Sequence, residues 1–178
     1  MEASVQTPTA MREVVLRPLT RETFAPFGDL ITPTEDGAPF GSADAAPDLS
    51  RGTPRLYIMR LPRRGLAFSQ ITRHRNVTQC LAALGGKPWL IAVAPPQPGE
   101  EASPELQDIA AFCIPGTMAI KLHRGTWHAG PHFEDDEMSF LNLELSDTNE
   151  IDHQSSHLSE RFGFALRFAV PPGKGPAE

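Results

Sequence analysis

The stretch "MAIKLHRGTWHAGPHFE", residues 118–134, begins as a strand and continues into a glycine turn and a cluster of histidines. Alternation at its start places Ile120 and Leu122 on one face and Lys121 and His123 on the other. Three of the chain's six histidines lie within the stretch. A metal site, an acid/base pair and a polar turn are three interpretations of such a segment, and the rest of the chain helps to decide between them.

Strand-like runs bounded by glycine or proline continue on both sides of this stretch. The run at 77–84 fits a helix or a strand, and its pattern favours a strand. A brief helical turn is expected over 20–28, with Thr20 as the N-cap and Gly28 as its end. Because long helical periods are nearly absent, the sequence predicts an all-β fold, a closed or nearly closed antiparallel barrel or sandwich with a few short helices. The expected strands are 13–19, 28–32, 55–61, 66–74, 77–84, 87–94, 109–114, 118–123, 138–146 and 161–170.

The chain of 178 residues is long enough for one domain with a real core and too short for two of ordinary size. We expect flexible tails at 1–11 and 171–178 and a single domain over 12–170. Two long polar segments, 32–54 and 94–105, show no apolar period and are expected to be loops, the first of them a lid or a surface excursion.

Composition excludes several classes of protein. The net charge is −6, from 16 Lys and Arg against 22 Asp and Glu, so the basic surplus of a nucleic-acid-binding protein is missing. Cys80 and Cys113 form no CxxC motif, and we expect them to be free thiols in a reducing compartment. No apolar run reaches the roughly 18 residues of a membrane span, and the first residues do not resemble a signal peptide. The sequence therefore predicts a cytoplasmic protein without nucleic-acid or membrane partners.

The histidine stretch contains "HRGTWH", which has the Gly-x-x-His spacing of the second metal-binding motif of cupin barrels and aligns His128 with its ligand. The first cupin motif supplies two histidines and a glutamate, and "TRHRNVTQ", residues 72–79, aligns with it. Thr72 then stands at one histidine position, His74 at the other and Gln79 at the glutamate position. Because two of the four expected ligands are absent, the sequence predicts no metal, with a divalent ion as the alternative.

Four segments together resemble the ureidoglycolate lyase family: "TRHRNVTQCL", "PWLIAVAPP", "HRGTWHAGPHF" and "FLNLELSDTNEIDH". The resemblance covers about residues 13–168, and the residues in these segments are similar to those of a plant- and cyanobacterium-like branch of the family. It implies a cupin-like barrel, of the double-stranded β-helix or jelly-roll kind. It also implies a homodimeric enzyme that cleaves ureidoglycolate to glyoxylate and urea during allantoin (purine) catabolism.

Ureidoglycolate is a hemiaminal, and its collapse needs a base for the hydroxyl proton, an acid for the departing nitrogen, and a cation for the carboxylate. In "SFLNLELS" the polar face, with Asn142 and Glu144, is either a solvent face or the inner face of the barrel. The alternatives to a lyase are a metal-dependent cupin enzyme with another substrate and a non-catalytic cupin that binds a small molecule. The candidate catalytic residues are His123 and His128, and the candidate substrate-binding residues are Lys121, Arg73, His74, Gln79, Asn142 and Glu144.

Overall fold

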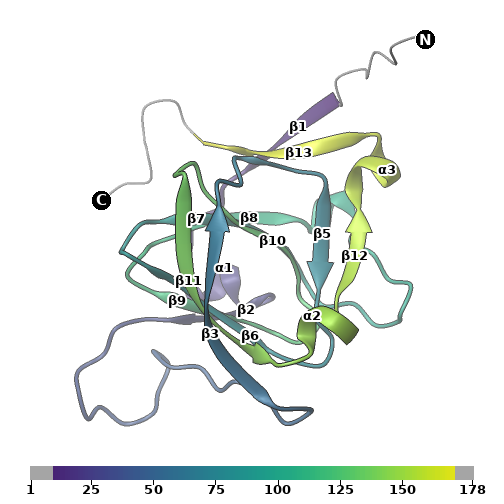
Figure 1. Ribbon diagram of the computed structural model, residues 1–178. Coiled ribbons are helices and arrows are strands. Elements are labelled where there is room, and N and C mark those ends of the chain that lie inside the picture. The colour runs from purple at the N-terminus through teal and green to yellow at the C-terminus, as the bar shows by residue number, and fades with distance from the viewer. Residues whose placement is uncertain (1–9, 171–178) are drawn as a thin grey trace.

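The computed structural model describes residues 10–170, and within them the strands form three sheets. A three-stranded sheet has the order β1-β13-β4, and two five-stranded sheets have the orders β12-β5-β10-β7-β8 and β2-β9-β6-β11-β3 (Figure 1). Every strand pair is antiparallel except β1 with β13. The predicted all-β, cupin-like class is confirmed. The strands are β1 (Ala10–Val15), β2 (Gly28–Ile31), β3 (Pro54–Pro62), β4 (Ala67–Phe68), β5 (Gln70–Arg73), β6 (Gln79–Leu84), β7 (Trp89–Ala94), β8 (Ala110–Ile114), β9 (Ala119–Leu122), β10 (Trp127–His132), β11 (Glu137–Leu145), β12 (Gln154–His157) and β13 (Phe164–Ala169).

The three sheets stack in layers, with the β5–β10–β7 sheet in the middle. One hydrophobic core fills the space between the two five-stranded sheets, and a second lies between the middle sheet and the three-stranded sheet. All six residues of β7, the run "WLIAVA", are buried because successive side chains enter the two cores alternately. A continuous apolar run is therefore the pattern of a strand in the middle layer, covered on both faces.

The helices are short. They are α1 (Arg21–Phe24), α2 (Thr148–Ile151) and α3 (Leu158–Phe162), with a 3-10 turn at Leu106–Asp108. Thr20 caps α1 as predicted, its hydroxyl accepting from the Thr23 N–H. Gly28 is not the end of that helix, since α1 ends at Phe24 and Gly28 begins β2. A Cβ at position 28 would lie 1.9 Å from the Lys121 backbone oxygen, so the close pairing of β2 with β9 requires glycine there.

Other elements also differ from those expected. The expected strand at 161–170 begins as α3, and β10 and β12 were not expected as strands. Gly130 and Pro131 interrupt the register between β10 and β7, which hides the alternation of β10 in the sequence. Residues 10 and 11, placed in the expected N-terminal tail, open β1 and pair with β13. The rest of that tail and the whole of 171–178 lie outside the described residues.

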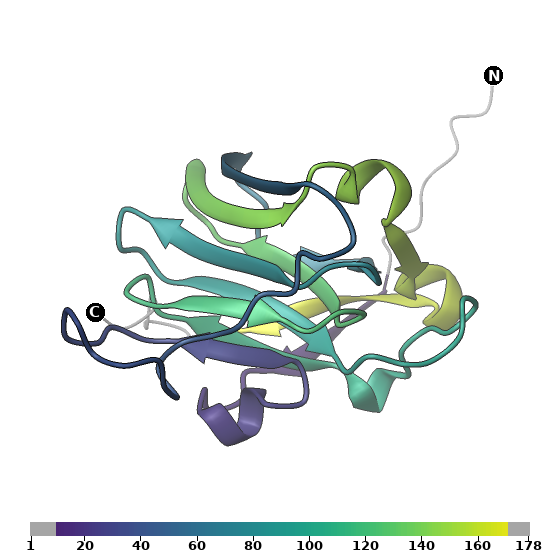
Figure 2. The ribbon, with the colours of Figure 1, turned by 90° about the horizontal axis from the view of Figure 1, so that it is seen from below.

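The polar segment 32–54 runs along the outside of the sheets (Figure 2, dark blue), and none of its residues lines the cavity that lies between the two five-stranded sheets. The backbone oxygen of Ser42 accepts a hydrogen bond from Arg21, and the Asp48 N–H donates to the Thr78 hydroxyl at 2.8 Å. These contacts hold the segment against α1 and the start of β6. Among residues 10–170, no helix is both long and apolar enough to cross a membrane.

Candidate active site

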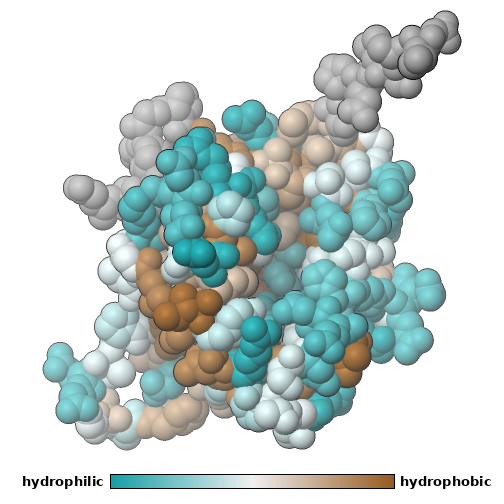
Figure 3. All heavy atoms as spheres, in the orientation of Figure 1, coloured by the Kyte–Doolittle hydropathy of each residue, from teal (hydrophilic) through white to brown (hydrophobic). Residues whose placement is uncertain are grey.

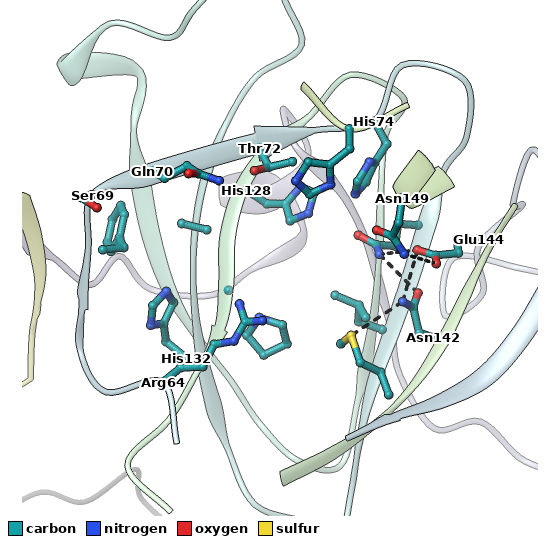
Figure 4. Close-up of a pocket in the computed structure, with 18 of the residues that line it drawn as sticks. Arg64, Ser69, Gln70, Thr72, His74, His128, His132, Asn142, Glu144 and Asn149 are labelled. Atoms are coloured by element: carbon teal, nitrogen blue, oxygen red, sulfur yellow. Dashed lines mark hydrogen bonds between the residues drawn. The ribbon is translucent and has the colours of Figure 1, made fainter. Parts of the chain in front are cut away.

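A cavity of about 460 Å³ opens between the two five-stranded sheets, beside the larger of the two cores. Its size suits a small organic molecule. The middle sheet contributes residues from β5 and β10, and the facing sheet contributes residues from β3, β6 and β11. In Figure 3 the opening is the recess near the centre of the face, and Figure 4 shows the side chains that line it.

Two histidines stand next to each other in the middle-sheet wall of this cavity. His128 lies on β10 opposite Thr72 of β5, and His74 follows directly after β5. The centroids of the two imidazole rings are 5.1 Å apart. The ring of His153 lies 5.6 Å from that of His74 and also lines the cavity.

Backbone carbonyls fix which nitrogen of each ring carries the proton. Nδ1 of His74 lies 2.6 Å from the Asp152 backbone oxygen, and Nδ1 of His128 lies 3.3 Å from the Thr126 backbone oxygen. A carbonyl oxygen only accepts, so Nδ1 carries the hydrogen in both rings. In each neutral imidazole, Nε2 is then left with a free lone pair and can act as a base or as a hydrogen-bond acceptor.

Burial keeps both imidazoles neutral. Desolvation, assisted by the neighbouring His74, lowers the pKa of His128 to about 3. Desolvation also lowers the pKa of His74, opposed by the hydrogen bond to the Asp152 carbonyl and by the Asp152 charge. Burial of both rings and the proximity of His74 to His128 therefore favour the neutral form of the pair.

The opposite wall holds a carboxylate surrounded by neutral hydrogen-bond donors. Glu144 is 1% exposed. Its Oε1 accepts from the Tyr57 hydroxyl at 3.2 Å and the Asn149 amide at 3.2 Å. Its Oε2 accepts from Gln79 at 3.0 Å and Asn142 at 3.3 Å. Four donors use the acceptor capacity of the carboxylate, which therefore orients the amides around it.

Comparison with known proteins assigns the chain to a family. The family model described as "Ureidoglycolate lyase" matches residues 11–163. That range contains every residue that lines the cavity. The chain belongs to the ureidoglycolate lyase family. The resemblance noted in the sequence is thereby confirmed at the level of the family.

Several bacterial proteins named ureidoglycolate lyase are similar to the chain. The one from Pseudomonas savastanoi pv. phaseolicola is 34% identical over 132 residues, which are 66% of this chain and 74% of that protein. The one from Chelativorans sp. is 30% identical over 131 residues, 66% of this chain and 76% of that protein. The one from Agrobacterium fabrum is 27% identical over 132 residues, 64% of this chain and 72% of that protein. These bacterial relatives do not confirm the plant- and cyanobacterium-like branch.

The structure brings five of the eight predicted site residues of this ureidoglycolate lyase family member to the cavity. They are His128 and His74 on one wall and Gln79, Asn142 and Glu144 on the other. All four positions aligned with the cupin motifs, Thr72 included, line the cavity. The polar face of β11 is thus the inner face of the barrel, not a solvent face.

The other three predicted residues lie elsewhere. His123 does not line the cavity, and its Nε2 is 3.1 Å from the Ala25 backbone oxygen. Lys121 points away from the cavity and pairs with Asp29 at 2.5 Å. Arg73 is 1% exposed, and its guanidinium donates to Gln154 and to the backbone oxygens of residues 97 and 99. Arg73 therefore fastens the 94–105 loop to β12.

The cavity also contains residues that the sequence did not single out. Arg64 is the only lysine or arginine among the described residues that line it. Tyr57, Asn149 and His153 are further polar residues of the lining, together with Ser69, Gln70 and His132. Their sequence signal is weak, because Arg64 lies in the turn "LPRRG" next to a second arginine, and Asn149 and His153 lie in a polar segment that resembles an ordinary loop.

The four cupin positions do not make a metal-binding set. They offer two imidazoles, one hydroxyl and one neutral amide. The Thr72 hydroxyl is 2.9 Å from the Ser155 hydroxyl, and the Gln79 amide nitrogen donates to Glu144. Within residues 10–170, no three His, Cys, Asp or Glu side chains are grouped so as to hold a metal ion. The donor set therefore does not fit a cupin metal centre.

Proposed function

We propose that the protein is a ureidoglycolate lyase, which splits ureidoglycolate into glyoxylate and urea during allantoin catabolism. The observation that carries the proposal is the pair of buried, neutral imidazoles with free Nε2 atoms in a cavity that lies wholly within the family match. The names of the bacterial relatives support the same substrate.

The reaction needs only a proton transfer and the cleavage of one bond. One carbon of ureidoglycolate bears a hydroxyl, a carboxylate and a urea nitrogen. When a base removes the hydroxyl proton, the oxygen lone pair forms the carbonyl of glyoxylate and the C–N bond breaks. Its electron pair goes to nitrogen, which takes up one proton and leaves as urea. The number of protons taken from oxygen equals the number returned to nitrogen, so the enzyme ends as it began.

In this proposal His128 and His74 form the acid/base pair. The lone pair on one Nε2 takes the hydroxyl proton, and the pair holds it until the nitrogen departs. Burial acts in opposite directions on the two proton transfers: it makes the protonated imidazole a strong acid toward the departing nitrogen, and it makes the neutral imidazole a weak base toward the hydroxyl. Gln79, with Asn142 and Glu144 behind it, forms the wall that the urea group faces. Lys121, Arg73 and His123 have no part in this mechanism, because they lie away from the cavity.

A direct assay tests the proposal. The purified protein is dialysed against EDTA, and glyoxylate release from ureidoglycolate is measured above the spontaneous background. Release that survives dialysis supports a metal-independent lyase. Loss of activity that a divalent ion restores would favour a metal-dependent cupin enzyme instead. If no glyoxylate is released and the ligand only raises the melting temperature, the protein is a binding module.

We further propose that residues 12–170 form one domain and that two copies associate as a homodimer in the cytoplasm. The outer face of the β3–β11 sheet supports association, because Leu56 and Ile58 on β3 are 63% and 61% exposed beside Leu141 of β11. Figure 3 shows hydrophobic atoms gathered over these strands. β3 is also an edge strand whose free backbone groups can pair with a second copy. Light scattering of the purified protein checks the dimer. The free thiols of Cys80 and Cys113 agree with a reducing compartment.

A further inference from the structure

The turn after β3 places Arg64 at the cavity while its neighbour Arg63 points elsewhere. The Arg63 guanidinium pairs with Asp136 at 2.7 Å. No hydrogen bond or ion pair engages the Arg64 guanidinium within residues 10–170, although that side chain lines the cavity. Figure 4 shows Arg64 beside His132, on the side of the cavity away from Glu144.

Backbone hydrogen bonds hold this turn on both sides of Arg64. The Arg63 N–H donates to the Asp136 backbone oxygen at 2.8 Å, and the Gly65 N–H donates to the Phe133 backbone oxygen at 3.0 Å. The Gly65 carbonyl accepts from Nδ1 of His132 at 3.0 Å. These bonds fix the backbone of the turn that carries Arg64 at the cavity, and a guanidinium suits a carboxylate.

The other end of the cavity offers an acceptor with no donor. Gln79 is 7% exposed, and its Oε1 is buried without a hydrogen-bond partner. The amide cannot turn over to relieve this, because its Nε2 donates to Glu144 Oε2 and to Asn142 Oδ1, which both accept. A buried carbonyl oxygen left unpaired costs stability, and the N–H of a ligand would satisfy it.

We propose that the cavity recognises its substrate from two ends: Arg64 binds a carboxylate, and Gln79 Oε1 accepts from the terminal N–H₂ of a carbamoyl group. Arg64 and Gln79 are then specificity-determining residues, one for the carboxylate and the other for the carbamoyl group of the substrate. The charge of Glu144 repels a carboxylate from the Gln79 end, which sets the orientation. The His74–His128 pair then faces the carbon between the two groups. This inference deepens the proposed function, and it depends on that function only for the identity of the carbon that reacts.

Two unreactive ligands separate the two ends. Ureidoacetate carries the carboxylate and the carbamoyl group but has no hydroxyl, so it cannot collapse. N-acetylglycine is nearly the same shape and has a methyl group in place of the terminal NH₂. We expect calorimetric titration of the wild-type protein to give a dissociation constant at least about tenfold lower for ureidoacetate than for N-acetylglycine, because only the former can donate to Gln79.

The variants test each contact. We expect Arg64→Gln to weaken binding of both ligands by about ten- to a hundredfold, because both lose a charge-assisted partner. Arg63→Gln is the matched control and should bind both within about twofold of wild type. We expect Gln79→Met to remove the preference for ureidoacetate while keeping the dependence on Arg64. Thermal melting of each variant verifies folding, and the comparison of ligands on the wild-type protein needs no variant.

Three results would overturn the inference: binding by Arg64→Gln within twofold of wild type, equal or tighter binding of N-acetylglycine by the wild-type protein, or no binding of ureidoacetate. These outcomes do not depend on turnover. Glyoxylate release together with any of them leaves the proposed lyase standing without this recognition scheme. The expected binding pattern without glyoxylate release leaves the recognition scheme standing without the lyase.

Discussion

Strands β9 and β11 belong to the same sheet, and both pair with β6, yet they turn opposite kinds of side chain inward. β9 buries Ile120 in the core and points Lys121 outward to Asp29. β11 points Glu144 into the cavity and leaves Leu141 on the outer surface. Alternation therefore tells which residues share a face. It does not tell which face is inward, because that depends on what lies opposite in the facing sheet. β9 faces the hydrophobic core, whereas the end of β11 faces the wall that contains the two histidines.

The largest expected effect distinguishes His128, which lines the cavity, from His123, which does not. We expect His128→Asn to lower kcat for glyoxylate release by at least about a hundredfold, as for loss of a general acid/base. We expect His123→Asn to stay within about twofold of wild type, since that ring bonds only the Ala25 backbone oxygen outside the cavity. Steady-state kinetics of the two variants, with melting curves to verify folding, make the measurement. Equal losses in both variants would contradict the assignment of the site to the cavity.

A smaller effect is expected when the inward-facing charge of β11, Glu144, or the outward-facing charge of β9, Lys121, is removed. Glu144→Gln keeps the shape but puts an N–H₂ among four donors, so we expect kcat/KM to fall about tenfold as Gln79 and Asn142 lose their orientation. Lys121→Met breaks the ion pair with Asp29, which is 41% exposed, and should cost no more than about 1 kcal/mol of stability while activity stays within twofold. Activity lost in the Lys121 variant alone would reverse the comparison.

The last expected effect concerns stability rather than activity: the stability should depend on pH because of the buried histidine on the inward-facing side. Burial lowers the pKa of His128 to about 3, against roughly 6.5 in an unfolded chain. Below that higher value the unfolded state binds a proton that the folded state does not. The stability due to neutral His128 is therefore complete above about pH 6.5 and is lost as the pH falls toward 3, at up to about 1.4 kcal/mol per pH unit.

His128→Asn should flatten this dependence, because asparagine does not titrate. Denaturant melts of the wild-type protein and the variant between pH 7.5 and 5 give the two slopes. His74 and His132 also have pKa values lowered by burial, so the variant should keep part of the slope. Identical slopes in the two proteins would mean that His128 is solvated in solution.

The sequence predicts the strands that alternate clearly and the residues that lie in motifs. Thr72, His74, Gln79 and His128 could be placed together because motif spacing reflects the pairing of β5 with β10. His123 and Lys121 were misplaced, since proximity to a motif along the chain does not decide which way a strand faces. Arg64 could not be found, because "LPRRG" offers two arginines and only the tertiary pairing of Arg63 with Asp136 separates them. The catalytic and binding roles themselves stay predictions until they are measured.

In β11 the polar side chains point inward and a leucine points outward, and this arrangement limits how the strand can change over evolution. Asn142 and Glu144 face the cavity, while Leu141, which precedes them and pairs with Ile58 of β3, is exposed on the outer surface. Insertion or deletion of one residue in this strand would exchange the two sets at once, placing leucines against the imidazoles and a carboxylate on the apolar exterior. The strand should therefore accept substitutions one position at a time but no change in length, whereas a change in length within residues 32–53, which lie outside the strands, would exchange no faces.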